Sequence, residues 1–207
     1  MTILLADAPV RAVPLIECSE PLVPLPLEIS PSGALVRAGL AGRLVAADAM
    51  LPSGVRLHVR EGHRPVQEQR AIIASYGAEL RALHPGIGRH ELERLTSRFV
   101  APLAVAPHVA GAAVDLTLVG PDGEELDLGT PIDATPEQSE GRCWFDADGI
   151  GADARAHRRL LASVLGAQGL VNYPTEWWHW SYGDRYWALV TGAAHALYGP
   201  LPALVAA

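Results

Sequence analysis

The chain has few cysteines, and they are poorly placed for chemistry. Only Cys18 and Cys143 occur among its 207 residues. They do not form a Cys-x-x-Cys pair, and neither lies beside the histidine and acidic clusters described below, so they are not candidate metal ligands. Because disulfides follow the redox compartment, we expect two free thiols in a reducing environment.

Runs of positive charge are also missing. The 16 Lys and Arg residues are outnumbered by 23 Asp and Glu residues, which gives a net charge of -7. A surface that binds a polyanion needs clustered cations. We therefore expect no nucleic-acid partner.

Long apolar runs are absent as well. No stretch reaches the roughly 18 apolar residues that a membrane-spanning helix needs. The N-terminus has no basic residue before its short apolar stretch, and Asp7 interrupts that stretch before the core of a signal peptide could form. These absences predict a cytoplasmic protein without a membrane partner. They leave the oligomeric state open, a homo-oligomer included.

Length and hydrophobic content predict one compact domain, since 207 residues with 49% hydrophobic content can bury one sizeable core. Residues 1–32 are rich in proline and lack a clear period, so we expect an extended arm packed on the domain rather than a helix or a central strand. Residues 33–207 then form the domain itself.

Apolar spacing and turn residues define the expected elements of that domain. The expected helices cover residues 33–50, 65–83, 89–99, 152–168 and 184–191, and the expected strands cover residues 55–59, 112–119 and 172–182. This order favours an α+β fold in which a small antiparallel sheet is flanked by helices.

Two clusters carry the chemistry. The segment Thr175–Asp184 places Glu176 and His179 in a run dense in tryptophan, where charged groups are costly unless they are paired or bound. Upstream, His108 and Asp115 flank a turn of small residues. Two histidines, one aspartate and one spare glutamate are what a zinc peptidase needs: three ligands and a carboxylate outside the ligand set.

The spacing of Glu176 and His179 sets their expected positions. Residues three apart lie on opposite faces of an ideal strand but on one face of a helix. Pro174 and the β-favouring tryptophans argue against a helix. We therefore expect Glu176 in the turn that enters a strand and His179 on the strand itself, with both facing one cavity.

These motifs together resemble a known family. The pattern H-x-x-G-x-A-x-D at 108–115, followed by E-W-W-H at 176–179, is similar to that of the D-alanyl-D-alanine dipeptidases of the vancomycin-resistance type. That family is related to zinc D,D-carboxypeptidases and to the signalling domain of hedgehog proteins. The resemblance extends from about Leu57 to Trp187, because the segments 61–65 and 126–133 also look like family segments.

The resemblance implies an enzyme, its metal and its base. It implies a zinc metallopeptidase that hydrolyses the small dipeptide D-alanyl-D-alanine, with one Zn²⁺ per chain on the face of the sheet. His108, Asp115 and His179 would bind zinc, and Glu176 would be the general base.

The resemblance also implies substrate contacts. Arg64 would stabilise the negative oxygen of the tetrahedral intermediate, and Asp133 would hold the ammonium group of the substrate. His63, next to Arg64, is the remaining histidine that we expect to line the pocket. Two departures make the dipeptide preference open: the family usually has serine at the position of Ala106 and tyrosine at that of His63.

Each residue also has an ordinary structural interpretation. Taken alone, His108 and Asp115 are typical of a turn that leads into a strand. Arg64 is equally typical of a salt bridge to Glu61 or Glu68, and Asp133 of a turn or helix cap. The tryptophans supply core and wall area whatever the function.

Two other functions remain open at this point. A D,D- or L,D-carboxypeptidase would trim longer peptidoglycan peptides, and would keep its cleft open toward the N-terminal extension of the substrate. A zinc-stabilised binding domain without catalysis would need neither Glu176 nor Arg64, because a structural zinc site is closed.

Overall fold

The structure is a computed structural model that describes residues 2–201. Residue 1 of the predicted arm and residues 202–207 of the predicted domain lie outside this range. In chain order, the elements are α1 (Ala8–Ala12), β1 (Leu22–Pro24), β2 (Leu35–Arg37), α2 (Ala38–Asp48), β3 (Arg56–Glu61), α3 (Val66–Leu83), α4 (Arg89–Thr96), η1 (Leu103–Val105), β4 (Ala113–Val119), α5 (Ala152–Ala167), β5 (Val171–Asn172), β6 (His179–Ser181) and α6 (Arg185–Thr191).

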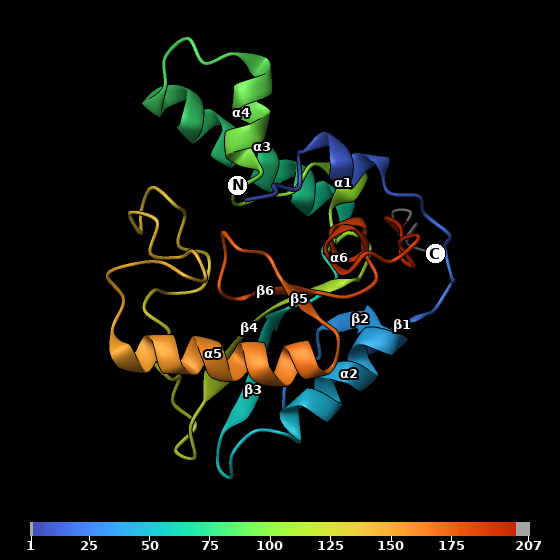
Figure 1. Cartoon of the computed structure of the whole chain (residues 1–207), viewed down its shortest axis with the longest axis vertical. Coiled ribbons are helices and arrows are strands. Elements are labelled where there is room, and N and C mark those ends of the chain that lie inside the picture. The colour runs from blue at the N-terminus through green and yellow to red at the C-terminus, as the bar shows by residue number, and fades with distance from the viewer. Residues whose placement is uncertain (1, 202–207) are drawn as a thin grey trace.

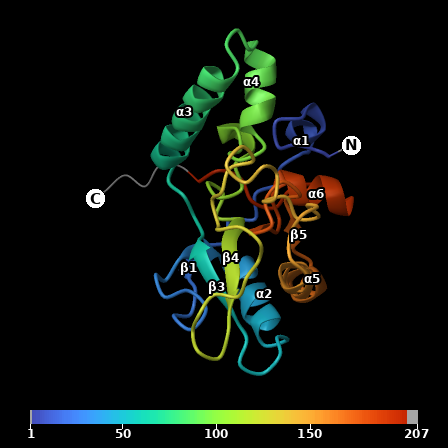
Figure 2. The same ribbon diagram turned by 90° about the vertical axis from the view of Figure 1, so that its left-hand side faces the viewer.

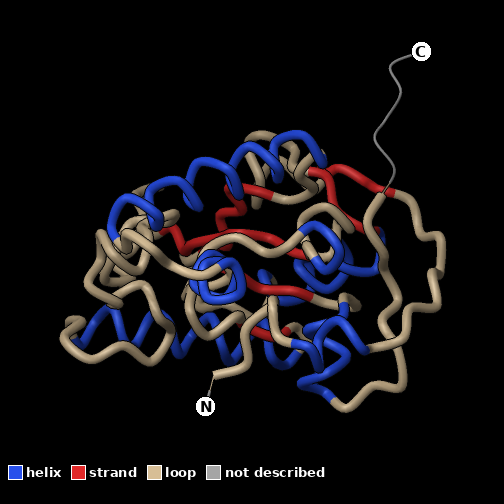
Figure 3. The backbone as a smooth tube through the Cα atoms, turned by 90° about the horizontal axis from the view of Figure 1, so that it is seen from above, coloured by secondary structure: helices blue, strands red, loops and turns tan. Residues whose placement is uncertain are grey.

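A four-stranded antiparallel sheet in the order β3-β4-β6-β5 forms the centre of the molecule, and β1 pairs with β2 in a smaller sheet. Helices α3 and α4 form a hairpin at one end, while α2 and α5 lie together at the other end (Figure 1). The turned view shows the same separation of the two helix pairs (Figure 2). Helices lie on both sides of the strands when seen from above (Figure 3). The predicted α+β class is confirmed.

Strand β4 has one face that packs in the main core and one face on the opposite side of the sheet. Its residues Val114, Leu116 and Leu118 are fully buried in the main core. The apolar faces of α2 and α5 complete this core, through residues Leu40, Leu44, Leu161 and Leu165. Because successive side chains of a strand point to opposite faces, Asp115 lies on the face away from α2 and α5.

The proline-rich arm is not wholly extended, which corrects the prediction for residues 1–32. It contains helix α1, whose first turn holds Pro9, a position where the missing N–H is tolerated. It also contains β1, whose residue Leu22 pairs with Arg37 of β2. This pairing is the reason that the helix expected at 33–50 begins only at Ala38.

The single strand expected at 172–182 is also wrong, because β5 and β6 pair with each other across a tight turn. Within it, the amides of Tyr173 and Glu176 donate to His179 O and Tyr173 O at 3.0 and 2.9 Å. The side chain of Asn172 donates to Glu176 O at 2.9 Å and to His179 O at 3.0 Å. Glu176 therefore lies in the turn and His179 on the strand, as expected.

The long loop between β4 and α5 is held by Arg158, a buried guanidinium on α5. It donates to the carbonyls of Leu128 at 2.8 Å, Arg142 at 2.9 Å, Trp144 at 2.5 Å and Phe145 at 3.1 Å. Burial lowers its pKa to about 10, so it stays charged at neutral pH. The hydrogen bonds from Arg158 thus hold the loop in place, as backbone hydrogen bonds would in a helix or strand.

Among residues 2–201, no helix is long and apolar enough to cross a membrane.

We predict that Arg158→Met lowers the free energy of unfolding by about 3 kcal/mol or more, because several buried carbonyls lose their donor at once. The matched control is Arg159→Met, since Arg159 is exposed on the same helix. It should change stability by less than about 0.5 kcal/mol. Urea unfolding measures both, and equal effects of the two substitutions would contradict this account of the loop.

Candidate metal centre and substrate cavity

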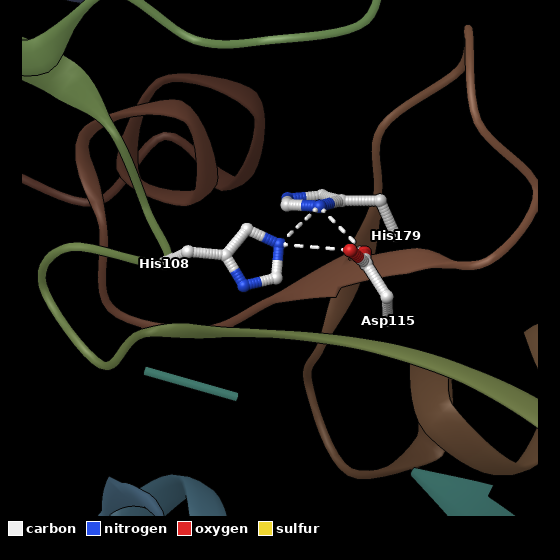
Figure 4. Close-up of side chains that lie close together, drawn as sticks. All are labelled: His108, Asp115 and His179. Carbon is white, nitrogen blue, oxygen red and sulfur yellow. Dashed lines mark hydrogen bonds and ion pairs between the residues drawn. The ribbon is translucent and has the colours of Figure 1, made fainter. Parts of the chain in front are cut away.

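Strand register places two of the predicted ligands side by side. Asp115 of β4 is paired with His179 of β6, and directly paired residues point to the same face of a sheet. His108 comes from the turn that precedes β4. Figure 4 shows the three side chains, His108, Asp115 and His179, converging on one point.

Two glycines bring the His108 turn into place. Gly111 has a φ of +65°, and a Cβ there would lie 2.4 Å from Leu22 Cδ2, so only glycine fits. At Gly62 a Cβ would lie 2.5 Å from the carbonyl oxygen of Leu35. That close approach lets the carbonyl of Gly62 contact His108 Nδ1 at 2.8 Å.

The three side chains present their ligand atoms at short distances. His108 Nε2 lies 3.1 Å from His179 Nδ1 and 3.2 Å from Asp115 Oδ2, and His179 Nδ1 lies 3.1 Å from Asp115 Oδ1. All three residues are buried. Ligands that surround zinc tetrahedrally at about 2.0–2.1 Å are about 3.3 Å apart, so the set has the right size.

Proton counting shows that this cluster fits a cation. A carbonyl oxygen can only accept, so His108 Nδ1 carries a proton toward Gly62, and in the neutral imidazole Nε2 is then a lone pair. That lone pair faces Asp115 and His179 Nδ1. Burial raises the pKa of Asp115, but protonated His108 and His179 hold it well below its usual range; in return, Asp115 raises the pKa of His108 against the effect of burial. A proton on Nε2 therefore occupies the place that a metal ion would take. A group of buried acceptors with few protons to share suits a metal ion.

Glu176 lies beside these residues but outside the set. Its Oε2 is 3.8 Å from His179 Nδ1. Burial raises the pKa of Glu176 well above its ordinary value, and the negative charges of Asp115 and Asp133 raise it further. The arrangement provides a carboxylate with raised proton affinity next to a metal site.

Arg64 is fixed by three neighbours. Its Nε donates to Glu61 Oε1 at 2.6 Å, one terminal nitrogen donates to Gln69 Oε1 at 2.9 Å, and the other lies 3.8 Å from Asp115 Oδ2. Gln69 is itself held by Ala101 O at 2.7 Å. The salt bridge to Glu61 and a place in the site are therefore compatible, and the guanidinium is rigid.

Glu61 is the site residue that sequence reasoning treated only as a partner of Arg64. It pairs with Asp115, whereas Val59, two residues earlier, pairs with Leu116 on the core side. The register shift between Val59 and Glu61 is a bulge, which turns Glu61 to the face of Asp115. Regular alternation would have placed Glu61 in the core, so strand periodicity could not signal its position, and the resemblance of segment 61–65 to a family segment was the available signal.

A cavity of about 270 Å³ opens beside the ligand set. This is slightly below the roughly 300–1,000 Å³ of pockets for drug-sized ligands, so it suits a very small molecule. The lining consists of Leu5, Glu61, Arg64, Gln69, Ile72, Phe99, Val100, Ala101, Pro107, His108, Asp115, Asp133, Tyr173, Glu176, Trp178 and His179. His63 and Ala106 are not among these residues, so the structure does not bring His63 to the cavity.

Asp133 reaches the cavity from the loop between β4 and α5. Burial raises its pKa to about 6, and the charges of Asp115 and Glu61 add to this effect. The same loop is tied to the α3–α4 hairpin through Glu137, which accepts a hydrogen bond from Tyr76 at 2.6 Å and pairs with Arg98. These contacts hold Asp133 on the cavity wall.

The tryptophans supply both core and wall. Trp177, Trp178 and Trp180 all pack in the main core, and Trp178 also lines the cavity. Trp177 also donates from Nε1 to Thr130 Oγ1 at 2.8 Å, which fastens the Asp133 loop to the Glu176 turn. Cys18 and Cys143 are free and take no part in the site, as expected.

Comparisons with known proteins found similar chains. A family model described as D-ala-D-ala dipeptidase matches residues 33–193. The D-alanyl-D-alanine dipeptidase of a Synechocystis species is 28% identical, over 87% of this chain and 89% of the relative. The dipeptidase of Streptomyces coelicolor is 31% identical, over 70% of this chain and 77% of the relative. The solved structure of VanYB in complex with D-alanine-D-alanine covers 90% of this chain and 94% of its own, at 20% identity and a TM-score of 0.49.

We predict about one zinc ion per chain in the wild type, and a large loss of zinc in His108→Ala, because removal of one of three ligands weakens the site steeply. His63→Ala is the matched control, since this histidine lies near the site but outside the cavity. Elemental analysis after dialysis against a weak chelator measures the zinc content. Equal zinc in the two variants would rule out the assigned ligand set.

Proposed function

Because the chain belongs to the D-ala-D-ala dipeptidase family, we propose that it is a zinc peptidase that hydrolyses D-alanyl-D-alanine to two molecules of D-alanine. One observation carries the proposal. The buried set of His108, Asp115 and His179 shares a cavity of about 270 Å³ with Glu176, a carboxylate that is not part of the set.

The metal and the base have separate tasks. His108, Asp115 and His179 would hold zinc, which supplies a Lewis acid that polarises the scissile carbonyl and lowers the pKa of water. Glu176 takes a proton from the attacking water while the water oxygen bonds to the carbonyl carbon. When the C–N bond breaks, Glu176 gives that proton to the leaving amine nitrogen. Its raised pKa makes Glu176 a stronger base than an ordinary glutamate.

Arg64 stabilises the charge that develops on the carbonyl oxygen. Its contacts with Glu61 and Gln69 hold the guanidinium before substrate arrives, so little reorganisation is needed during the reaction. Burial alone would lower the pKa of Arg64, but the hydrogen bond and charge of Glu61 raise it, so the side chain stays positive.

Asp133 binds the free ammonium group of the dipeptide. It lines the cavity, and above its pKa of about 6 it carries the negative charge that an ammonium ion requires. The negative charges of Asp115 and Glu61 also raise this pKa, whereas the positive charges of Arg64 and His108 lower it. A substrate with a longer N-terminal extension would have no ammonium group at this position.

These roles favour the dipeptidase over the two alternatives. A structural zinc site needs neither a base nor a fixed guanidinium, yet Glu176 and Arg64 both line the cavity. A carboxypeptidase of peptidoglycan peptides would keep its cleft open toward the N-terminal extension of the substrate. Such a substrate has no ammonium group there for Asp133 to bind. The small volume beside the ligand set also suits a dipeptide better than a longer peptide.

We also propose how the chain is divided into an arm and a domain, and where it is located in the cell. We assign residues 1–32 to an arm and residues 33–207 to the peptidase domain, a division supported by the start of the family match at residue 33. A cytoplasmic location is supported by the free state of Cys18 and Cys143.

We predict that Glu176→Gln lowers kcat for D-alanyl-D-alanine by roughly 10²–10⁴-fold, because the amide cannot take the proton of water. Its zinc content should equal that of the wild type, since Glu176 is not a ligand. Glu68→Gln is the control, an exposed glutamate on α3 that should leave kcat unchanged. Near-normal turnover by zinc-loaded Glu176→Gln would show that another group is the base.

We predict that Asp133→Asn raises KM for D-alanyl-D-alanine at pH 7 by roughly tenfold, because a charge-assisted hydrogen bond is lost. In the wild type, KM should fall as the pH rises through about 6, since Asp133 becomes charged over that range. The variant should lack this dependence.

An N-acetylated D-alanyl dipeptide and an N-acylated tripeptide serve as the comparison substrates. Neither carries the ammonium group, so Asp133→Asn should leave their rates unchanged. If the wild type prefers these substrates to the free dipeptide, the chain is a carboxypeptidase.

A further inference from the structure

The N-terminal arm reaches the substrate cavity. Leu5 lies among the residues that line it, and the side chain is only 3% exposed. It packs in one apolar cluster with Ala101 and Tyr173, which also line the cavity. The arm is therefore part of the wall of the active site, although the family match begins only at residue 33.

Hydrogen bonds fix Leu5 to the domain. Its amide donates to the hydroxyl of Tyr173 at 3.1 Å, and that hydroxyl donates to Ser97 O at 2.5 Å. The neighbouring amide of Leu4 donates to Asp7 Oδ2 at 2.8 Å. Leu5 thus has a defined position relative to the wall.

The rest of the arm is anchored on both sides of this point. Helix α1 contacts α6 and η1. Arg185 of α6 donates to Arg11 O at 2.9 Å, and Arg11 pairs with Glu93 of α4. A segment held at so many points acts as a rigid wall.

The lining divides by chemistry. Its charged members are the residues assigned above to the metal, the base, the oxyanion and the ammonium group, together with Glu61, which holds Arg64. Its apolar members, which include Leu5, Val100 and Ala101, are left for the side chains of the substrate. In a cavity this small, a single methylene group decides which side chain fits.

We propose that Leu5 is a specificity-determining residue, whose side chain limits the size of the side chain that a dipeptide brings into the cavity. This inference rests on the proposed peptidase activity. It gives the arm a function: the arm narrows the cavity so that it accepts alanine and excludes larger side chains.

The test compares two neighbouring leucines. Leu4 and Leu5 are each 3% exposed and belong to the same apolar cluster, but only Leu5 lines the cavity. Leu5→Ala and Leu4→Ala therefore remove similar packing, and only one of them enlarges the cavity. The substrates are D-alanyl-D-alanine, D-alanyl-D-leucine and D-leucyl-D-alanine, so that a larger side chain is presented at each position.

We expect Leu5→Ala to raise kcat/KM for one leucine-containing dipeptide, relative to D-alanyl-D-alanine, by at least about tenfold. Leu4→Ala should leave this ratio within about twofold of the wild type. Leu5→Phe should act in the opposite direction and raise KM for D-alanyl-D-alanine. If the alanine variants do not fold, Leu5→Val and Leu4→Val give the same comparison with smaller changes.

An equal change of the ratio in the Leu4 and Leu5 variants, or no change in either, would overturn the inference. Titration calorimetry with the same dipeptides, in the zinc-loaded Glu176→Gln background, repeats the comparison without turnover. Absence of turnover on every dipeptide by the wild type would refute the proposed activity. An unchanged selectivity of binding on removal of the Leu5 side chain would refute the role of Leu5.

Discussion

The convergence of three buried acceptor groups is the constraint on which the rest of the structure depends. The ligand atoms of His108, Asp115 and His179 lie 3.1–3.2 Å apart, a separation that is satisfied only when protons or a cation lie between them. A proton between these atoms supplies partners in the metal-free chain, and a cation supplies them when bound, because buried polar groups without partners are costly. The β4–β6 register and the close approach of Gly62 hold the three side chains in this arrangement. Stability of the centre and its affinity for metal are therefore two aspects of the same geometry.

Much of this centre could be predicted from the sequence, because the ligand residues sit in short local motifs. His108 and Asp115 belong to one turn and strand, and Glu176 and His179 to one turn and strand, so local pattern placed each pair. Other positions depend on contacts that no local pattern records. The bulge that turns Glu61 toward the site is one example, and the absence of His63, next to Arg64, from the cavity lining is another.

The fold shows the same limit. The helices expected at 65–83 and 152–168 form almost as predicted, because their apolar spacing and stop signals are local. The arm and the loop before α5 were less predictable. Their order comes from distant partners: β2 for the first, and the guanidinium of Arg158 for the second. Proline content marked the arm as irregular, but could not show that it pairs with β2 or that Leu5 lines the cavity.

The charges in the cavity explain why segments that are far apart in the sequence must meet there. Within the described residues of the lining, four carboxylates, Glu61, Asp115, Asp133 and Glu176, face the single guanidinium of Arg64. A divalent metal and the ammonium group of a dipeptide supply the three positive charges that neutralise the remainder. The carboxylate of the dipeptide then adds one negative charge, and the proton that Glu176 takes from the attacking water only moves charge within the cavity. The cavity is thus close to charge balance when metal and substrate are bound together, so the segments that supply these carboxylates must meet around both.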